Sequence, residues 1–253
     1  MRITLRIACG LLVAATLPVP SAEAADTIVP HTATYKIKIS IASGTLTTSV
    51  RESGDGFYVH SVIEPTGLAA LLTSGNIEES SQFSVDERGV RPLIYSSSNT
   101  LSSDNEFMHF TFDYRANVVS GTFNDEPYKY ELDEETHDRV SIQYELMNSL
   151  MTGKPDTEYR LLDGDELKEI TVSDIGTRRI KTPIGSFDAI GIQHRSARKN
   201  RVTTLWCVEE LGYIPVLIEQ SRNGKAQGRA ELIDYDPGEP GETSLSPTLS
   251  SGN

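Results

Sequence analysis

Cysteine is scarce in this sequence. The 253 residues include two cysteines, Cys9 and Cys207, and Cys9 lies in an N-terminal apolar segment. One remaining cysteine cannot form an internal disulfide, which excludes a disulfide-stapled scaffold. Because no CxxC motif accompanies Cys207, we expect a buried thiol rather than a redox or catalytic one.

Basic residues and long apolar runs are also few. The chain has 23 Lys and Arg against 36 Asp and Glu, a formal net charge of −13. This excess of negative charge argues against nucleic acid or an anionic membrane as a partner. After the N-terminal segment, no run approaches the roughly 20 apolar residues of a membrane span. We therefore expect no transmembrane segment.

Complete catalytic and cofactor motifs are missing as well. The sequence contains no GxSxG, HExxH, Walker or GxGxxG motif. None of the five histidines has a second ligand at a usual zinc spacing on one recognisable element. The sequence therefore predicts no metal site and no cofactor, and it leans against an enzyme.

Residues 1–24 have the pattern of a cleavable signal peptide. Arg2 and Arg6 precede a short apolar core, and Ala22-Glu23-Ala24 supplies small residues at −3 and −1 of the expected cleavage site. Cys9 stands too early in the apolar core for lipid attachment, so a lipoprotein is not expected. We predict cleavage after Ala24 and export to the periplasm.

Alternation of polar and apolar residues dominates the rest of the chain. Residues 31–41 and 106–114 each place one apolar row on one face, which predicts half-buried strands. Asp163-Gly164 and Asn223-Gly224 each predict a tight turn between two such strands. About a dozen strands at this spacing predict an all-β fold, mainly antiparallel.

Two segments break the alternation. Residues 138–152 predict a helix that Asp138 caps and Gly153 ends, with Val140, Tyr144, Met147 and Met151 on one face. Residues 67–73 predict a short helical turn. We expect one domain over residues 25–236, a strongly curved sheet or barrel-like meander with one packed helix. The composition of residues 237–253, rich in Pro, Gly, Ser and Thr, predicts a disordered tail.

Charge is unevenly distributed along the chain. Residues 125–169 hold fourteen acidic and five basic side chains, whereas residues 178–229 hold ten basic and four acidic ones. The basic block includes Arg195, Arg198, Lys199 and Arg201 around an expected hairpin tip. It is either a solvated strand face or an edge that contacts an anion or a partner.

Adjacent carboxylates at Glu78 and Glu79 lead into a strand. Alternation sends them to opposite faces, so one should point inward and need a partner, for which Arg91 is a candidate. The pair is either structural, as an ion pair, or lines a ligand cavity. Aromatic side chains on strand faces, including Phe110, Phe112 and Trp206, either line the same cavity or fill the core.

Three functions fit these observations. The first is a non-enzymatic protein that binds or carries an apolar or elongated ligand of the cell envelope, such as a lipid, glycan or peptide, or binds an envelope protein. The second is a hydrolase acting on cell-wall or polysaccharide material through Glu78, Glu79 and Asp113, which requires two of these acids to converge. The third is a structural partner that pairs through edge strands.

An ordered set of short segments resembles one bacterial family. The segments are Glu78 to Phe83, Arg91-Pro92, Phe110 to Asp113, Asp138, Thr182 to Phe187, Leu205-Trp206 and Ile214-Pro215-Val216. Their order and spacing over residues 31–236 are similar to the domain of unknown function 3108 family. The resemblance implies an exported, largely β protein, and it supplies no established activity and no catalytic residues.

Overall fold

The computed structural model describes residues 28–39, 42–73, 75–101, 104–133, 136–153, 158–196 and 200–238. The predicted signal peptide lies outside these residues, as does the predicted tail after Gly238. Fifteen strands, two α-helices and one short 3-10 helix, η1, make up the described part of the chain. Their bounds are β1 His31–Ile39, β2 Ala42–Ser53, β3 Gly56–Thr66, α1 Leu68–Leu72, β4 Ile77–Asp86, β5 Gly89–Asn99, β6 Glu106–Asp113, β7 Val118–Phe123, β8 Glu126–Glu131, β9 Thr136–His137, α2 Ser141–Thr152, β10 Glu158–Asp163, β11 Glu166–Thr182, β12 Gly185–Ser196, β13 Arg201–Val208, η1 Glu209–Leu211, β14 Ile214–Arg222 and β15 Lys225–Pro237.

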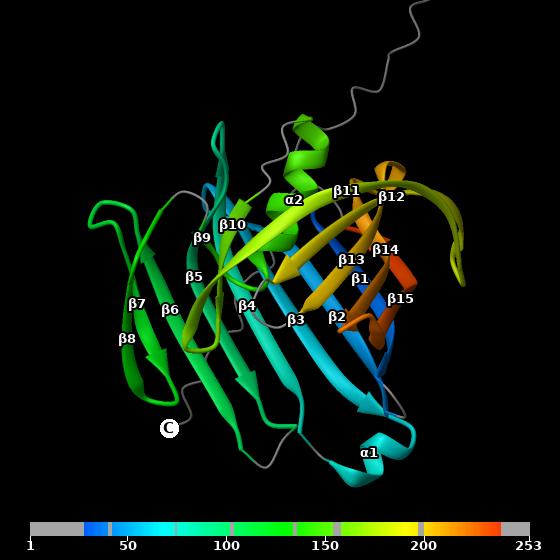
Figure 1. Ribbon diagram of the computed structural model, residues 1–253, viewed down its shortest axis with the longest axis horizontal. Coiled ribbons are helices and arrows are strands. Elements are labelled where there is room, and N and C mark those ends of the chain that lie inside the picture. Colours follow the sequence, from blue (N-terminus) through cyan, green and yellow to red (C-terminus); the bar gives the residue numbers. More distant parts are fainter. Residues whose placement is uncertain are drawn as a thin grey trace, which may run out of the picture.

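All fifteen strands belong to one curved sheet (Figure 1). Their spatial order is β8-β7-β6-β5-β4-β3-β2-β1-β15-β14-β13-β12-β11-β10-β9. Strands that follow one another in sequence are therefore neighbours in the sheet, except β8 and β9 at its two edges, and the first strand, β1, pairs with the last, β15. Every pairing is antiparallel apart from the short parallel pair of β9 with β10. The predicted class, an all-β and mainly antiparallel curved sheet with one packed helix, is confirmed.

The sheet curves toward closure without completing a barrel, since β8 and β9 are its two edge strands. Side chains bridge part of the gap between the edges. The Tyr130 hydroxyl on β8 donates a hydrogen bond to the Asp165 carbonyl in the β10–β11 turn. The ring of Phe123 on β7 lies beside Gly164 of the same turn. The fold is therefore barrel-like with an open seam.

Turn chemistry follows the sequence at both predicted hairpins. Asn223 and Gly224 have φ of 50° and 72°, the left-handed conformation that a two-residue turn between β14 and β15 requires. Gly164 has φ of 72° between β10 and β11. β15 runs through Pro237, the first residue of the predicted tail, and the Gly238 amide donates to the Pro30 carbonyl.

Helix α2 lies within the curve of the sheet, as Figure 1 shows. Asp138 accepts hydrogen bonds from the Val140 and Ser141 amides at 2.8 Å, and Gly153 ends the helix at φ 65°. The predicted end at Gly153 is confirmed, whereas the helix begins at Ser141 with Val140 at the N-cap position, and Asp138 caps the turn that leads into it. α2 is buried along most of its length, because apolar parts of the sheet pack against it on two sides.

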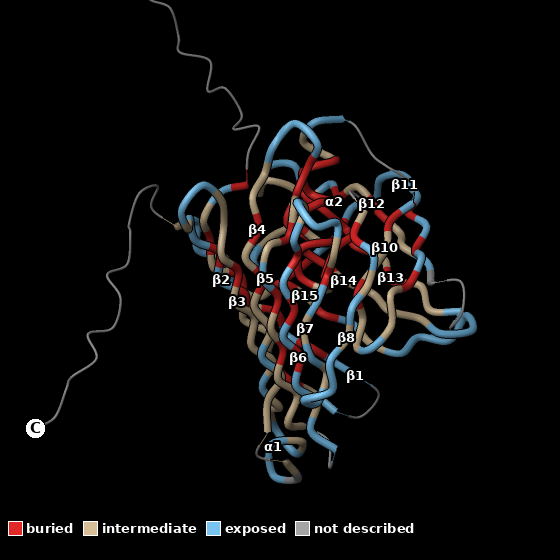
Figure 2. Tube along the Cα trace, turned by 90° about the vertical axis from the view of Figure 1, so that its left-hand side faces the viewer, coloured by how far each residue is buried: buried red, intermediate tan, exposed pale blue. Residues whose placement is uncertain are grey.

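The two sides of α2 pack on opposite parts of the sheet. Tyr144 packs on Phe83 of β4 with ring centroids 5.3 Å apart, within the larger core cluster. Ile142 and Leu146 join a second cluster with residues of β10 to β13. Figure 2 shows the buried residues concentrated around α2 and along the inner strands. The predicted face of the helix is correct, and a second apolar face adds to it.

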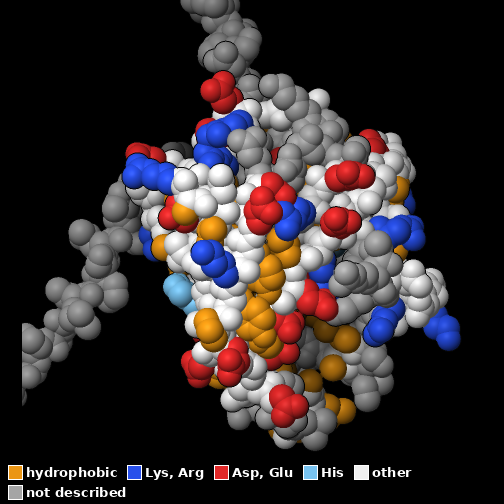
Figure 3. All heavy atoms as spheres, turned by 60° about the vertical axis from the view of Figure 1, so that its left-hand side comes forward, with side chains coloured by type: hydrophobic (Ala, Val, Ile, Leu, Met, Phe, Trp, Pro, Cys, Tyr) orange, Lys and Arg blue, Asp and Glu red, His pale blue; other side chains and the backbone are white. Residues whose placement is uncertain are grey.

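Charges of both signs cover the exterior. On the face shown in Figure 3, acidic and basic side chains are interspersed around a band of hydrophobic ones. The exposed apolar side chains include Leu68 and Leu71 of α1, at 78% and 81% exposure. In the part of the chain that the structure describes, no helix combines the length and hydropathy needed to span a membrane.

Candidate functional site

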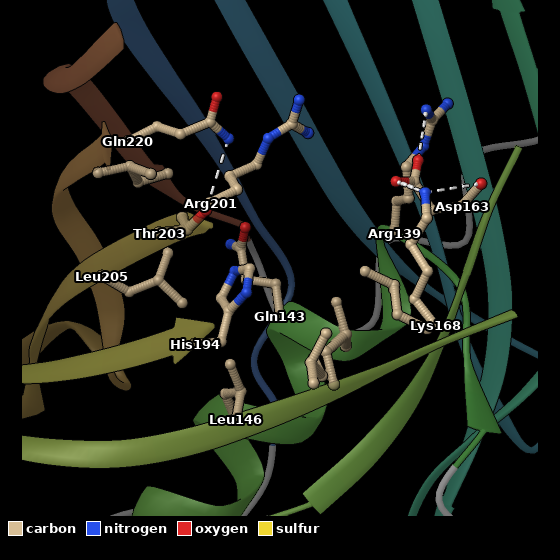
Figure 4. Close-up of a pocket in the computed structure, with 14 residues that line it drawn as sticks. Arg139, Gln143, Leu146, Asp163, Lys168, His194, Arg201, Thr203, Leu205 and Gln220 are labelled. Atoms are coloured by element: carbon tan, nitrogen blue, oxygen red, sulfur yellow. Dashed lines mark hydrogen bonds and ion pairs between the residues drawn. The ribbon is translucent and has the colours of Figure 1, made fainter. Parts of the chain in front are cut away.

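A pocket of about 300 Å³ lies between α2 and the strands β10 to β14 (Figure 4). Six apolar side chains form much of its lining: Ile142, Leu146, Leu161, Ile170, Leu205 and Ile218. This size is at the lower end of the range for small-molecule sites, which are mainly apolar with a few placed polar groups. Its apolar lining and its place against the buried helix α2 make it a candidate ligand site.

Strand register arranges the pocket wall in rows. Leu205 of β13 aligns with Ile192 of β12 and Ile218 of β14, which gives an apolar row. Two residues along β13, Thr203 aligns with His194 and Gln220, which gives a neutral polar row. Alternation on a strand places all of these side chains on the pocket face of the sheet.

The next row along the same face is cationic. Arg201 of β13 aligns with Arg222 of β14. The wall therefore changes from apolar to neutral polar to cationic over three successive rows.

One side of the pocket holds paired charges. Arg139 lies 2.7 Å from the Glu79 carboxylate and 3.5 Å from Asp163, and Lys168 pairs with Asp163. The Tyr95 hydroxyl completes this group, because it donates to Glu79 at 2.8 Å and accepts from Arg139 at 2.9 Å. In Figure 4, Arg139, Asp163 and Lys168 stand together on this side. These charges hold the start of α2 against β4, β5 and β10.

The opposite side of the pocket holds polar groups without such partners. Within the described residues, no acidic side chain forms an ion pair with Arg201, and the side chains of His194 and Gln143 make no hydrogen bond. Burial and the nearby Arg201 lower the pKa of His194 to about 4, so this imidazole is neutral at physiological pH. Three polar groups there are free to meet a ligand.

A second cavity of about 100 Å³ lies across the start of α2. Ile63 and Ile77 of β3 and β4 line it, together with Tyr144. Arg139 and Gln143 line both cavities. The two cavities therefore adjoin each other at these two side chains.

The structure separates the two adjacent carboxylates that the sequence singled out. Glu79 points inward to Arg139, as alternation predicts for one of the two. Glu78 points outward, where its carboxylate lies 3.1 Å from His60 with 48% of the side chain exposed. Glu79 is part of the charged group at the pocket, and Glu78 is not.

The predicted partner of the inward carboxylate, Arg91, is wrong. The β4–β5 register sets Ser97 opposite Glu79 and Arg91 opposite Ser84, at the far end of the hairpin. Arg91 lies 3.5 Å from Asp86 and over the ring of Tyr114. Arg139, which sequence reasoning passed over, takes its place because the chain segment leading into α2 runs beside β4.

The predicted aromatic residues pack in the core. Phe110 and Phe112 are 0% and 4% exposed on β6, and Trp206 is 6% exposed on β13. Trp206 faces away from the pocket, because alternation turns it opposite to Leu205. Its indole N–H donates to Glu219 at 3.0 Å, and Arg178 covers the ring at 4.0 Å. None of the described residues that line the pocket is Phe, Tyr or Trp.

Groups proposed for catalysis do not converge. Asp113 is exposed at the end of β6, where its carboxylate accepts hydrogen bonds from the Arg115 and Ala116 amides in a turn. Register places Glu79 level with Ser97 and Met108, five residues before Asp113 on β6. The acids of the hydrolase hypothesis are therefore dispersed over both faces of the sheet.

Cys207 is buried, as expected, and burial raises the pKa of its thiol to about 12. The described residues contain no cluster of three His, Cys, Asp or Glu side chains that could hold a metal ion.

Comparison with known proteins gives a family. A family model described as a protein of unknown function (DUF3108) matches residues 31–231. The chain belongs to the DUF3108 family. No curated protein matches this DUF3108 chain.

A solved structure shares the architecture. It is a β-barrel-like protein of the domain of unknown function DUF1849 from Brucella abortus, with a TM-score of 0.55 and 11% identity. The match covers 82% of the DUF3108 chain and 97% of the other. At this identity the similarity concerns the fold alone.

Proposed function

We propose that this chain is an exported, non-enzymatic binding protein that carries an apolar or elongated ligand of the periplasm in the pocket beside α2. The observation that carries the proposal is the pocket of about 300 Å³ with six apolar lining residues. Such a lining encloses hydrocarbon, because apolar surface leaves water on binding.

The second cavity supports an elongated ligand. Arg139 and Gln143 line both cavities, and the Gln143 side chain makes no hydrogen bond within the described residues. We infer that a rotation of the Gln143 side chain connects the two cavities. A ligand longer than the main pocket can then extend past the start of α2.

Binding is favoured over hydrolysis by the placement of the acids. Carboxylate catalysis needs two carboxyl groups on either side of one bond. Glu78 and Asp113 are exposed and apart, and Glu79 is engaged by Arg139 and Tyr95. We therefore do not propose the hydrolase.

Purification of the protein from periplasm, followed by mass spectrometry of bound lipids and co-purifying proteins, tests the carrier directly. We expect a small amphiphilic or apolar molecule at near-stoichiometric amount. Recovery of a stoichiometric protein and no small molecule would instead favour a structural partner that pairs through an edge strand.

Leu161→Trp provides the matched variant, because this side chain of β10 lines the pocket and a larger ring fills it. Ile94→Trp is the control, since Ile94 is 40% exposed on β5. We expect the bound molecule to be lost from Leu161→Trp and kept by Ile94→Trp. Equal retention by the two variants contradicts the proposed site.

A further inference from the structure

The side chains of the pocket wall indicate the chemical class of the ligand, which the volume of the pocket alone does not. The wall runs from Leu205 and its neighbours, through Thr203 and His194, to Arg201 over three rows of one sheet face. Apolar, neutral polar and cationic groups thus follow one another in a line. A molecule that matches this order has an apolar body at one end and a negative charge at the other.

No described acidic side chain neutralises the positive end of the line. Arg139 and Lys168 are each engaged by carboxylates of Glu79, Asp163 or Glu166. Arg201 has no such partner within the described residues, although the whole chain carries a net charge of −13. An unpaired guanidinium at a pocket wall is a ready site for an anionic group, which it can bind with two parallel hydrogen bonds.

Neighbouring strands add positive charge at the same end of the sheet. Arg222 lies opposite Arg201, and Lys225 lies opposite Arg222 across the β14–β15 turn. This cationic end, formed by Arg201, Arg222 and Lys225, attracts anions over a distance of about 10 Å.

The row below the cations is neutral and can donate hydrogen bonds. His194 is uncharged at physiological pH, and Gln143 faces it from α2 (Figure 4). The Gln220 amide already donates to the Thr203 hydroxyl at 3.5 Å. Polar atoms of a ligand next to its anionic head, such as ester or acid oxygens, can form hydrogen bonds with this row. These bonds do not require a second charge on the ligand.

We propose that the pocket binds an amphiphile with a single anionic head, which Arg201 holds while Leu205, Ile218 and Leu146 enclose the apolar body. This inference rests on the proposed function and adds the class of the ligand. The shared chemistry covers a carboxylate or a phosphate head on one apolar chain. A cationic amphiphile is excluded by the same side chains.

Calorimetric titration of the mature protein with four probes of equal chain length tests the head group. Decanoate and decyl phosphate carry an anionic head, decanol a neutral one and decylamine a cationic one. We expect both anions to bind at least about tenfold more tightly than decanol, the gain of a charge-assisted hydrogen bond, and decylamine to bind least. The ratio between the two anions tells a carboxylate ligand from a phosphate.

Variants of Arg201 test its role. Arg201→Gln should weaken the binding of decanoate by about tenfold and leave the affinity for decanol unchanged. Arg201→Lys should keep part of the preference for anionic probes. Arg51→Gln is the control, because it also removes one positive charge but at an exposed position of β2, where Arg51 lies over the ring of Tyr58. If Arg201→Gln does not fold, the ranking of the four probes on the unchanged protein still decides the question.

The outcomes separate the two proposals. Binding of all four probes with similar affinity overturns the anionic head and leaves the apolar carrier intact. Binding of none of them overturns the carrier function and this inference together. If Arg51→Gln reduces the preference for decanoate over decanol as much as Arg201→Gln does, the role of Arg201 is overturned.

Discussion

Glu78 and Glu79 are adjacent in sequence and differ in every physical respect. Glu78 is half exposed and pairs with His60, whereas Glu79 has 20% of its side chain exposed and pairs with Arg139. Alternation along β4 is the whole cause of this difference. One position along a strand therefore separates a surface carboxylate from one that anchors α2.

Substitution of each acid by its amide measures the difference. Glu79→Gln leaves the guanidinium of Arg139 short of its nearest counter-charge in a largely buried place, so we expect the free energy of unfolding to fall by about 2 kcal/mol. Glu78→Gln breaks only an exposed pair and should change it by less than about 0.5 kcal/mol. Urea unfolding of the two variants checks the prediction, and equal losses would contradict it.

Arg91 shows where reasoning at the level of single residues stops. The alternation of β4 correctly requires an inward carboxylate and a partner for it. The partner depends on the register of the β4–β5 hairpin, which shifts at a bulge between Gln82 and Phe83, and on the path of the chain before α2. Neither is encoded in a local pattern, so Arg139 could not be chosen over Arg91.

At the scale of elements, α2 is the part that creates the pocket. Its predicted face, with Tyr144 and Met147, packs on the larger core, and its other face supplies Ile142 and Leu146 to the pocket. Ile142, Leu146 and Leu150 recur every four residues, so the sequence contained a signal for this second face. A helix that is apolar on two sides is a helix enclosed by the sheet.

Asp138, in the turn before α2, links the position of the helix to pH. It is fully buried, and burial raises the pKa of this carboxyl to about 6, although hydrogen bonds from Ser141, Ser81 and Val140 act in the opposite direction. In the unfolded chain the carboxyl titrates near 4. The folded protein thus keeps a proton that the unfolded chain releases between about pH 4 and pH 6.

This difference has a definite sign. The stabilisation from the bound proton is present below about pH 4 and is lost as pH rises through about 6, for a total of up to about 3 kcal/mol. Asp138→Asn keeps a capping side chain and removes the titration. As pH rises from about 4 to about 6, we expect the free energy of unfolding of the unchanged protein to fall relative to that of Asp138→Asn. Urea unfolding at several pH values measures both. Parallel pH curves would contradict the assignment.

At the scale of the whole molecule, the fold class follows from strand alternation and turn residues, which are local. The pocket does not, because it forms where α2 packs against β10 to β14, and no local pattern predicts that packing. The aromatic residues illustrate the limit. Phe110, Phe112 and Trp206 are residue types expected in a binding groove. They belong to the core instead, because other side chains cover the strand faces on which they lie.

Export is the proposal that concerns the whole chain. Expression of the full sequence in a Gram-negative host should give a periplasmic protein whose N-terminus, read by mass spectrometry, is Ala25. Ala24→Leu places a large residue at −1 and should block this cleavage, whereas Ala25→Leu should not. A cytoplasmic product that keeps Met1 would contradict the proposal.

The return of β15 to β1 has a kinetic consequence. His31 pairs with Pro237 in the centre of the sheet, so the contact that joins its two halves spans almost the whole described chain. Folding rates fall as the sequence separation of native contacts grows. The two halves can form early as local meanders, each from strands that are close in sequence. We therefore expect the docking of β15 on β1, which joins the two halves into one sheet, to be the slow step of folding.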